Sequence, residues 1–143
     1  MKVEFLENDT IIIHIIRDID ISNRNNLGVL LKEIGVYLKR KYHYLYSGLY
    51  NVSVYQYLDY FVFEIHKISN SSSIDFNISF HPNSLMLFEF LDEDYILGKK
   101  YYLDGKYYVD FKIVSSCFDN LEFGKVIYKE EVENIMRKAI IVS

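Results

Sequence analysis

The sequence predicts an α+β fold in which a mostly antiparallel sheet packs against a long helix in the N-terminal half and a second helix near the C-terminus. Three patterns favour this fold class. Apolar residues recur at helical spacing over 27–38 and again over 132–139. Residues 74–80 alternate strictly between apolar and polar, which is typical of a strand. Asp104 and Gly105 join two further strand-like segments in the manner of a tight hairpin.

Length and composition favour a single domain over residues 1–143. Half of the 143 residues are hydrophobic, 17% are aromatic and one is proline. A chain of this length can bury about two-thirds of the surface that its unfolded form exposes. The composition is far from that of disordered chains. We therefore expect one core, a sheet of about six to eight strands, and order along nearly the whole chain.

Charge and cysteine content restrict the partners and the compartment. The net charge of -4 provides no general attraction for nucleic acid or for an anionic membrane, so neither is an expected partner. The apolar run Ile11–Ile16 is too short to cross a bilayer, and the acidic start of the chain differs from a signal peptide. Cys117 is the only cysteine, which excludes an intramolecular disulfide and a cysteine-based metal site and favours the cytoplasm.

The chain begins with two predicted strands, Val3–Leu6 and Thr10–Ile16, around a polar turn. The second is apolar at nearly every position, which indicates a central strand covered on both faces. His14 in this strand is interpreted as a core histidine with a backbone or hydroxyl partner, and the alternative is a ligand role.

The next element is a helix that follows the capping residues 22–26. Gly28 and Gly35 lie seven residues apart on it and indicate either close packing on a sheet or a weak helix. Its apolar stripe comprises Leu27, Leu30, Leu31, Ile34 and Leu38.

The end of this helix interleaves cations with aromatic rings, a pattern suited to phosphate contacts and base stacking. The residues are Lys39, Arg40, Lys41, Tyr42 and Tyr44. Cations also stabilise the negative end of a helix dipole, and the chain as a whole is acidic. We therefore favour a structural role, with nucleic-acid binding as the alternative.

Three further strands are predicted, two as a hairpin over 49–68 and one over 74–80. Glu64 and His66 share one strand face and could pair, or could hold a metal if His81 supplied a third ligand. Because such pairs are ordinary on exposed sheet faces, we predict no metal site and no cofactor.

Leu85–Leu91 is interpreted as a strand, and Asp92–Asp94 as a solvated turn that lacks the other ligands of a calcium loop. A hairpin is then predicted from Lys99–Leu103 and Lys106–Val114. Tyrosines between lysines make its wet face a candidate protein-binding surface, since tyrosine gives contact area at low entropic cost. That face comprises Lys100, Tyr102, Lys106 and Tyr108. The predicted core comprises Tyr107, Val109, Phe111 and Ile113, with Val132, Ile135 and Met136 from the last helix.

The rest of the chain predicts a strand over 121–128 and a helix over 129–139. Acidic residues in the first turn and basic residues in the last turn of that helix match its dipole. Cys117 has no base near it in sequence, so we interpret it as a small inert thiol. The apolar segment Ile140–Val142 must pack or pair.

This C-terminal region resembles the MecA-type adaptors of low-GC bacteria. The resemblance lies in Tyr101–Phe111 (YYLDGKYYVDF), in Leu121–Tyr128 (LEFGKVIY) and in Ile135 of the last helix. Those adaptors are α+β proteins without catalytic residues that deliver substrates to a Clp-family unfoldase. The resemblance implies a non-enzymatic cytoplasmic adaptor.

No set of nucleophile, base and oxyanion donors can be assembled from the sequence, so no catalytic residue is predicted. The favoured hypothesis is a protein-interaction protein, an adaptor, regulator or inhibitor, that can form homo-oligomers. The alternative is a hydrolase or nuclease-like enzyme in which a sheet gathers histidines and acids that are distant in sequence. Those residues are His43, His66, His81, Glu64 and Asp92–Asp94.

Overall fold

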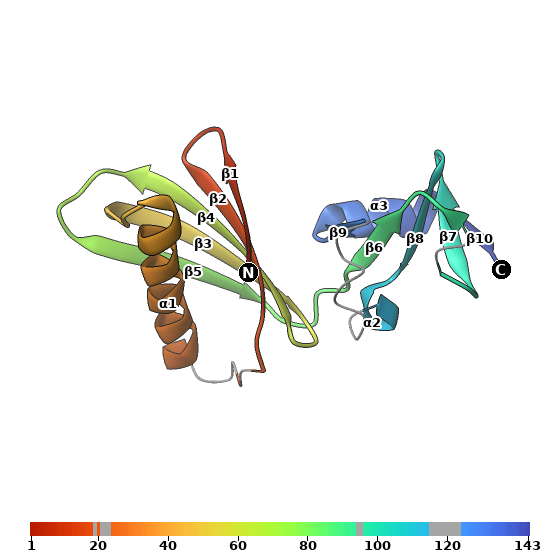
Figure 1. Cartoon of the computed structure of the whole chain (residues 1–143), viewed down its shortest axis with the longest axis horizontal. Coiled ribbons are helices and arrows are strands. Elements are labelled where there is room, and N and C mark those ends of the chain that lie inside the picture. The colour runs from red at the N-terminus through yellow and green to blue at the C-terminus, as the bar shows by residue number, and fades with distance from the viewer. Residues whose placement is uncertain (19, 21–23, 94–95, 115–123) are drawn as a thin grey trace. The chain divides into compact units, whose positions relative to one another are not determined.

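A computed structural model gives the fold and describes residues 1–18, 20, 24–93, 96–114 and 124–143 (Figure 1). Cys117, Asp94 and residues 121–123, for which the sequence makes predictions, lie outside the described residues. Contacts divide the chain into a first unit, Met1–His81, and a second unit, Pro82–Ser143. The protein is α+β with mostly antiparallel strands, as predicted.

The first unit is a five-stranded sheet with one helix. The strand order is β1-β2-β4-β3-β5, and every neighbouring pair is antiparallel except β3 and β5, which are parallel. The predicted hairpins β1–β2 and β3–β4 are confirmed. The elements are β1 (Lys2–Leu6), β2 (Thr10–Ile16), α1 (Arg24–Tyr42), β3 (Gly48–Tyr57), β4 (Tyr60–Ser69) and β5 (Ile74–His81).

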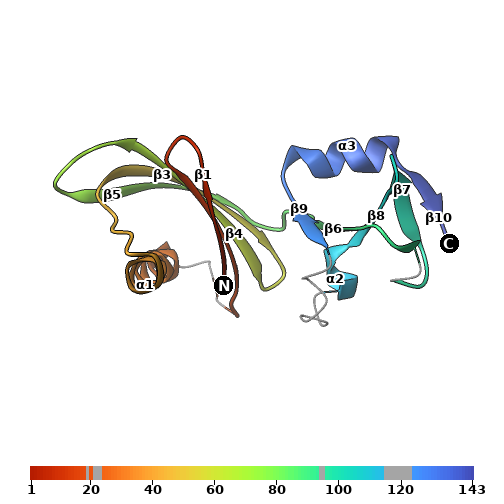
Figure 2. The ribbon, with the colours of Figure 1, turned by 45° about the horizontal axis from the view of Figure 1, so that its top comes forward.

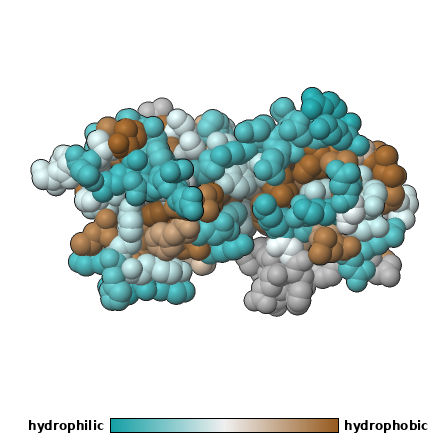
Figure 3. Space-filling view, turned by 90° about the horizontal axis from the view of Figure 1, so that it is seen from above, coloured by the Kyte–Doolittle hydropathy of each residue, from teal (hydrophilic) through white to brown (hydrophobic). Residues whose placement is uncertain are grey.

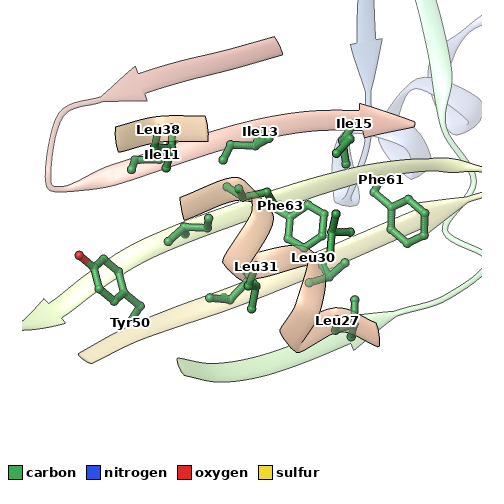
Figure 4. Packing of buried hydrophobic residues seen from close by; sticks show 14 residues of the cluster. Ile11, Ile13, Ile15, Leu27, Leu30, Leu31, Leu38, Tyr50, Phe61 and Phe63 are labelled. Atoms are coloured by element: carbon green, nitrogen blue, oxygen red, sulfur yellow. The ribbon is translucent and has the colours of Figure 1, made fainter. Parts of the chain in front are cut away.

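One face of this sheet is covered by α1, which Figure 2 shows end-on. The predicted apolar stripe of the helix is confirmed, because each of its five residues is at most 3% exposed. The stripe packs against alternate residues of the central strands, including Ile13, Phe63 and Tyr50 (Figure 4). Burial of one such side chain contributes about 1.5–3 kcal/mol relative to leaving it in water. This apolar contact is therefore the main reason that α1 stays on the sheet.

Two glycines of the first unit, Gly35 within α1 and Gly48 at the start of β3, allow close approaches. A Cβ on Gly35 would lie 2.7 Å from Cε2 of Tyr46, whereas a Cβ on Gly28 would meet nothing within 4 Å. Close packing therefore explains Gly35 and not Gly28, and it occurs against a tyrosine ring. Gly48 begins β3 with φ 104°, and a Cβ there would collide with the carbonyl oxygen of Ser69.

The second unit is a five-stranded, entirely antiparallel sheet with the order β10-β7-β8-β6-β9. Helices α3 and α2 lie on opposite sides of it (Figure 2). The apolar segment at 140–142 pairs with β7, as expected of a segment that must pack or pair. The elements are β6 (Leu87–Phe90), β7 (Lys100–Leu103), β8 (Lys106–Asp110), α2 (Phe111–Val114), β9 (Lys125–Ile127), α3 (Glu130–Lys138) and β10 (Ile140–Val142).

The structure corrects two predictions about the strands. The predicted single sheet of six to eight strands is wrong, since the strands form two sheets of five. The predicted strand 106–114 ends at Asp110, and the following residues form α2. The strand ends here for a local reason. The Asp110 carboxylate accepts a hydrogen bond from the backbone N–H of Lys112 at 3.0 Å and so caps the helical turn.

The surface in Figure 3 is mostly hydrophilic, with apolar patches on both units. Within the part of the chain that the structure describes, none of the helices has both the length and the apolar character needed to cross a membrane.

Candidate functional site

The first sheet has a second face, opposite the one that α1 covers. Side chains alternate along a strand, so Tyr50, Val52 and Val54 of β3 enter the core beneath α1 while the residues between them point the other way. We name the polar part of this opposite side the polar face. It comprises Asn51, Ser53 and Tyr55 of β3, Glu64 and His66 of β4, and Asp75, Asn77, Ser79 and His81 of β5.

The parallel pair β3–β5 organises the polar face into cross-strand pairs. Asn51 lies opposite Asn77, and the Asn77 side-chain amide donates to the Asn51 side-chain oxygen at 3.4 Å. Tyr55 lies opposite His81, with ring centroids 4.6 Å apart and ring planes 9° from parallel. Asn51, Asn77 and His81 are exposed and Tyr55 is half-buried. These two cross-strand contacts keep the two amide side chains and the stacked rings in fixed positions on the solvent side of the sheet.

His14 lies on the same side of the sheet, in β2. Its Nδ1 is 2.7 Å from the Tyr60 hydroxyl oxygen, which confirms the predicted hydroxyl partner, and its side chain is half-buried rather than fully in the core. The pKa of His14 is lowered from 6.5 to about 4, mainly by burial and also by the charge of Lys2, while Glu4 partly opposes both effects. Burial, with a smaller contribution from Glu4, raises the pKa of Tyr60 above its usual value. Both side chains are therefore neutral near pH 7 and form a hydrogen-bonded pair.

Two histidines of the hydrolase hypothesis, His66 and His81, lie far apart within the first unit. His66 hydrogen-bonds Thr10, with 2.9 Å between Nδ1 and Oγ1, and it lies two strands and four register positions from His81. Strand geometry puts the two Cα atoms about 16 Å apart. His43 follows the last residue of α1, and Asp92 and Glu93 belong to the second unit. No three His, Cys, Asp or Glu side chains gather as a metal site among the residues that the structure describes.

The segment proposed for nucleic acid lies at the C-terminal end of α1. Its three cations are in the last turn and exposed. Lys41 Nζ donates to the Tyr37 hydroxyl at 3.1 Å and lies 5.7 Å from the Tyr42 ring centroid. Tyr42 packs edge-on against Phe5, and the Tyr44 and Tyr50 hydroxyl oxygens are 3.3 Å apart. The rings that would stack on bases thus contact protein side chains, and nucleic-acid binding stays a prediction.

The predicted wet face of the β7–β8 hairpin is wrong as a single exposed surface. Tyr108 is 5% exposed and Lys100 is 3% exposed. The two tyrosines also lie on different sides of the sheet, because Tyr108 pairs with Tyr101 whereas Tyr102 pairs with Tyr107. Tyr102 is half-buried and Lys106 is exposed, and protein binding at these two residues stays a prediction.

Tyr108 and Lys100 are buried on opposite sides of the sheet, each by its own contacts. Tyr108 belongs to a core cluster with Val132 and Ile135 of α3, and its hydroxyl donates to Glu89 Oε1 at 3.0 Å. Lys100 lies on the opposite side, and its Nζ donates to the carbonyl oxygen of Gly98 at 2.9 Å. The predicted core is confirmed for Val109, Phe111, Val132 and Ile135. Tyr107 is half-buried, and Ile113 and Met136 are exposed.

A polar cavity of about 420 Å³ lies at the start of α1. Arg17 Nη2 and Glu33 Oε2 form an ion pair at 3.2 Å within its lining. Because the cation of Arg17 is already balanced, this cavity presents no unopposed positive charge for an anion. The lining comprises Arg17, Asp18, Asp20, Asn26, Val29, Leu30 and Glu33.

The sequence predicts a wet face on each of these strands but does not single those faces out as a site. The alternation of Asn51, Ser53 and Tyr55 with valines, and of Asn77 and Ser79 with apolar residues, was a usable signal for one wet face per strand. The parallel pairing that joins the two wet faces has no local sequence pattern.

No family model, curated protein or solved structure matches this chain.

Proposed function

We propose that this chain is a non-catalytic cytoplasmic protein-interaction protein, an adaptor, regulator or inhibitor, and that a partner protein binds its polar face. The observation that carries the proposal is the row of side chains on β3 and β5. Tyr55 and His81 form a stacked pair there, flanked by Asn51, Asn77 and serines.

The chemistry of this row suits protein recognition. Tyrosine supplies a large contact area with few rotatable bonds, while Ser and Asn supply adaptable hydrogen bonds, and the three together dominate antibody binding loops. The stack of Tyr55 on His81 holds both rings in place before a partner arrives, which reduces the entropy lost on binding.

The separation of His66 from His81 also supports recognition over catalysis. General acid–base chemistry needs its groups within hydrogen-bond reach of one reacting site. His66 and His81 are about 16 Å apart by strand geometry, and the His66 ring is engaged with Thr10. The resemblance of the second unit to MecA-type adaptors accords with an adaptor role and stays a prediction.

The test compares two arginine substitutions at exposed sites of the same unit. Asn51→Arg places a long charged side chain in the middle of the polar face without removing a core contact. Val36→Arg is the matched control, because Val36 is 51% exposed on α1 and distant from that face. Each tagged full-length variant is used to capture partners from a lysate, and bound proteins are quantified by mass spectrometry.

We expect the amount of a specific partner captured by Asn51→Arg to fall about tenfold or more below wild type. An unpaired charge in an interface costs more than about 1.4 kcal/mol of binding free energy. Val36→Arg should retain it, and both variants should melt at the wild-type temperature. Equal retention of every captured protein by the two variants would contradict binding at the polar face.

A further inference from the structure

β5 is a long edge strand with one side unpaired within the sheet. It spans eight residues and is the last strand in the sheet order, bonded only to β3. It contains no proline, lysine or arginine, which are the residues that usually protect an edge from pairing. Ile74 is 53% exposed and Ile78 is 37% exposed, on the side where Phe76 and Phe80 join the core.

One hydrogen bond shows which backbone groups face the open edge. The backbone N–H of Phe76 donates to the Asp75 carboxylate at 2.9 Å. This amide therefore points away from β3. Backbone N–H and C=O groups alternate in direction along a strand, so those of Phe76, Ile78 and Phe80 face outward together. The edge thus has three outward-facing residues for a new antiparallel strand.

We propose that β5 pairs antiparallel with β5 of a second copy of this chain, about a two-fold axis at Ile78. In this register Phe76 lies opposite Phe80 of the second copy, and Ile78 lies opposite its own equivalent. All of the outward-facing N–H and C=O groups of these residues then bond across the axis. The five-stranded sheet of the first unit in one copy then joins the same sheet of the second copy, which gives one sheet of ten strands.

The side chains of β5 are self-complementary in this register. On the polar face, the Asp75 carboxylate lies opposite the imidazole of His81 in the second copy, and symmetry repeats the pair. On the other face, two Phe76–Phe80 pairs and the Ile78 pair extend the apolar layer beneath α1. The carboxylate is freed for this contact, because the Phe76 N–H donates to the new strand instead.

Other registers are less complementary. A shift by one residue would bring the polar side of one copy against the apolar side of the other. A shift of the axis to Asn77 places Asp75 opposite Ser79 and carries His81 beyond the paired segment. A second copy is therefore the occupant that the sequence of β5 fits best. This inference concerns the sheet edge and does not depend on partner binding at the polar face.

The test is the sedimentation velocity of the full chain over a range of concentrations. Wild type is expected to shift from monomer to dimer as concentration rises. Ile78→Arg brings two like charges together at the axis and is expected to leave a monomer with an unchanged circular dichroism spectrum. Val36→Arg adds the same charge on α1 and is expected to dimerise as wild type does.

A charge exchange tests the register itself. Asp75→Lys places a cation opposite His81, and His81→Glu places an acid opposite Asp75, so each single variant is expected to raise the dimer dissociation constant about tenfold. The double variant restores an opposite-charge pair and is expected to recover the wild-type constant to within about threefold.

Three results would overturn the inference: a wild-type chain that stays monomeric at every concentration, a dimer that persists in Ile78→Arg, or a double variant no tighter than the singles. These outcomes are separate from those of the capture test. Asn51 lies on β3, so Asn51→Arg is expected to dimerise normally whether or not it captures a partner.

Discussion

His14 makes the stability of the first unit depend on pH. Its pKa is 6.5 in an unfolded chain and about 4 in the fold, mainly because burial disfavours the charged imidazole. Above pH 6.5 the histidine is neutral in both states and its full contribution to stability is present. As pH falls from 6.5 to 4, the unfolded chain takes up a proton that the folded chain refuses, so stability is lost across that window.

The size of the loss follows from the difference between the two pKa values. A difference of about 2.5 pH units corresponds to a maximum of about 3 kcal/mol, reached below pH 4. At pH 5 the loss is about 2 kcal/mol, since the unfolded chain is nearly fully protonated and the folded chain is about one-tenth protonated. This is a large part of the stability of a typical small domain.

Urea unfolding at pH 7.5 and pH 5, followed by circular dichroism, measures the loss. His14→Gln keeps a polar side chain near the Tyr60 hydroxyl and cannot titrate, so it serves as the reference. We expect wild type to lose about 2 kcal/mol more than His14→Gln between the two pH values. An NMR titration in which the His14 ring protonates near 6.5, or equal losses in the two proteins, would refute the reasoning.

Two further predictions concern stability alone. Gly28→Ala should raise the free energy of unfolding by about 1 kcal/mol, because the new methyl group meets nothing and alanine is the better helix former. Gly35→Ala should bring no such gain, because its Cβ would press on the Tyr46 ring, and equal gains in urea unfolding would contradict this packing. Tyr108→Ser should cost about 3–5 kcal/mol by emptying the space beneath α3, whereas Tyr108→Phe should lose only the bond to Glu89 and cost about 1–3 kcal/mol. A Tyr108→Ser variant with the wild-type melting temperature would contradict the burial of that ring.

Much of the local structure can be predicted from the sequence because short-range patterns govern it. The apolar stripe of α1 predicts both the helix and the face that it buries. The hairpin turns are predicted by their position between strand patterns, and Leu58, Asp104 and Gly105 adopt the positive φ values that such tight turns require. His14 is predicted to be buried because nearly every neighbour in its strand is apolar.

The division into two sheets cannot be predicted in the same way. Pairing between strands that are distant along the chain depends on which apolar faces find each other, and no local pattern encodes that choice. The parallel contact of β3 with β5 and the contact of β7 with β10 are both of this kind. The first of these contacts creates the polar face and leaves β5 at the edge.

The sequence by itself determined the fold class, the position of nearly every helix and strand, and the residues that share a face within each strand. Only the tertiary structure decided which of those faces would meet solvent. Tyr108 shows the physical reason: alternation places it on the same face as Lys106, but α3, formed by residues further along the chain, covers that ring. Exposure depends on packing between distant segments, and the surfaces available for recognition therefore follow from the complete fold.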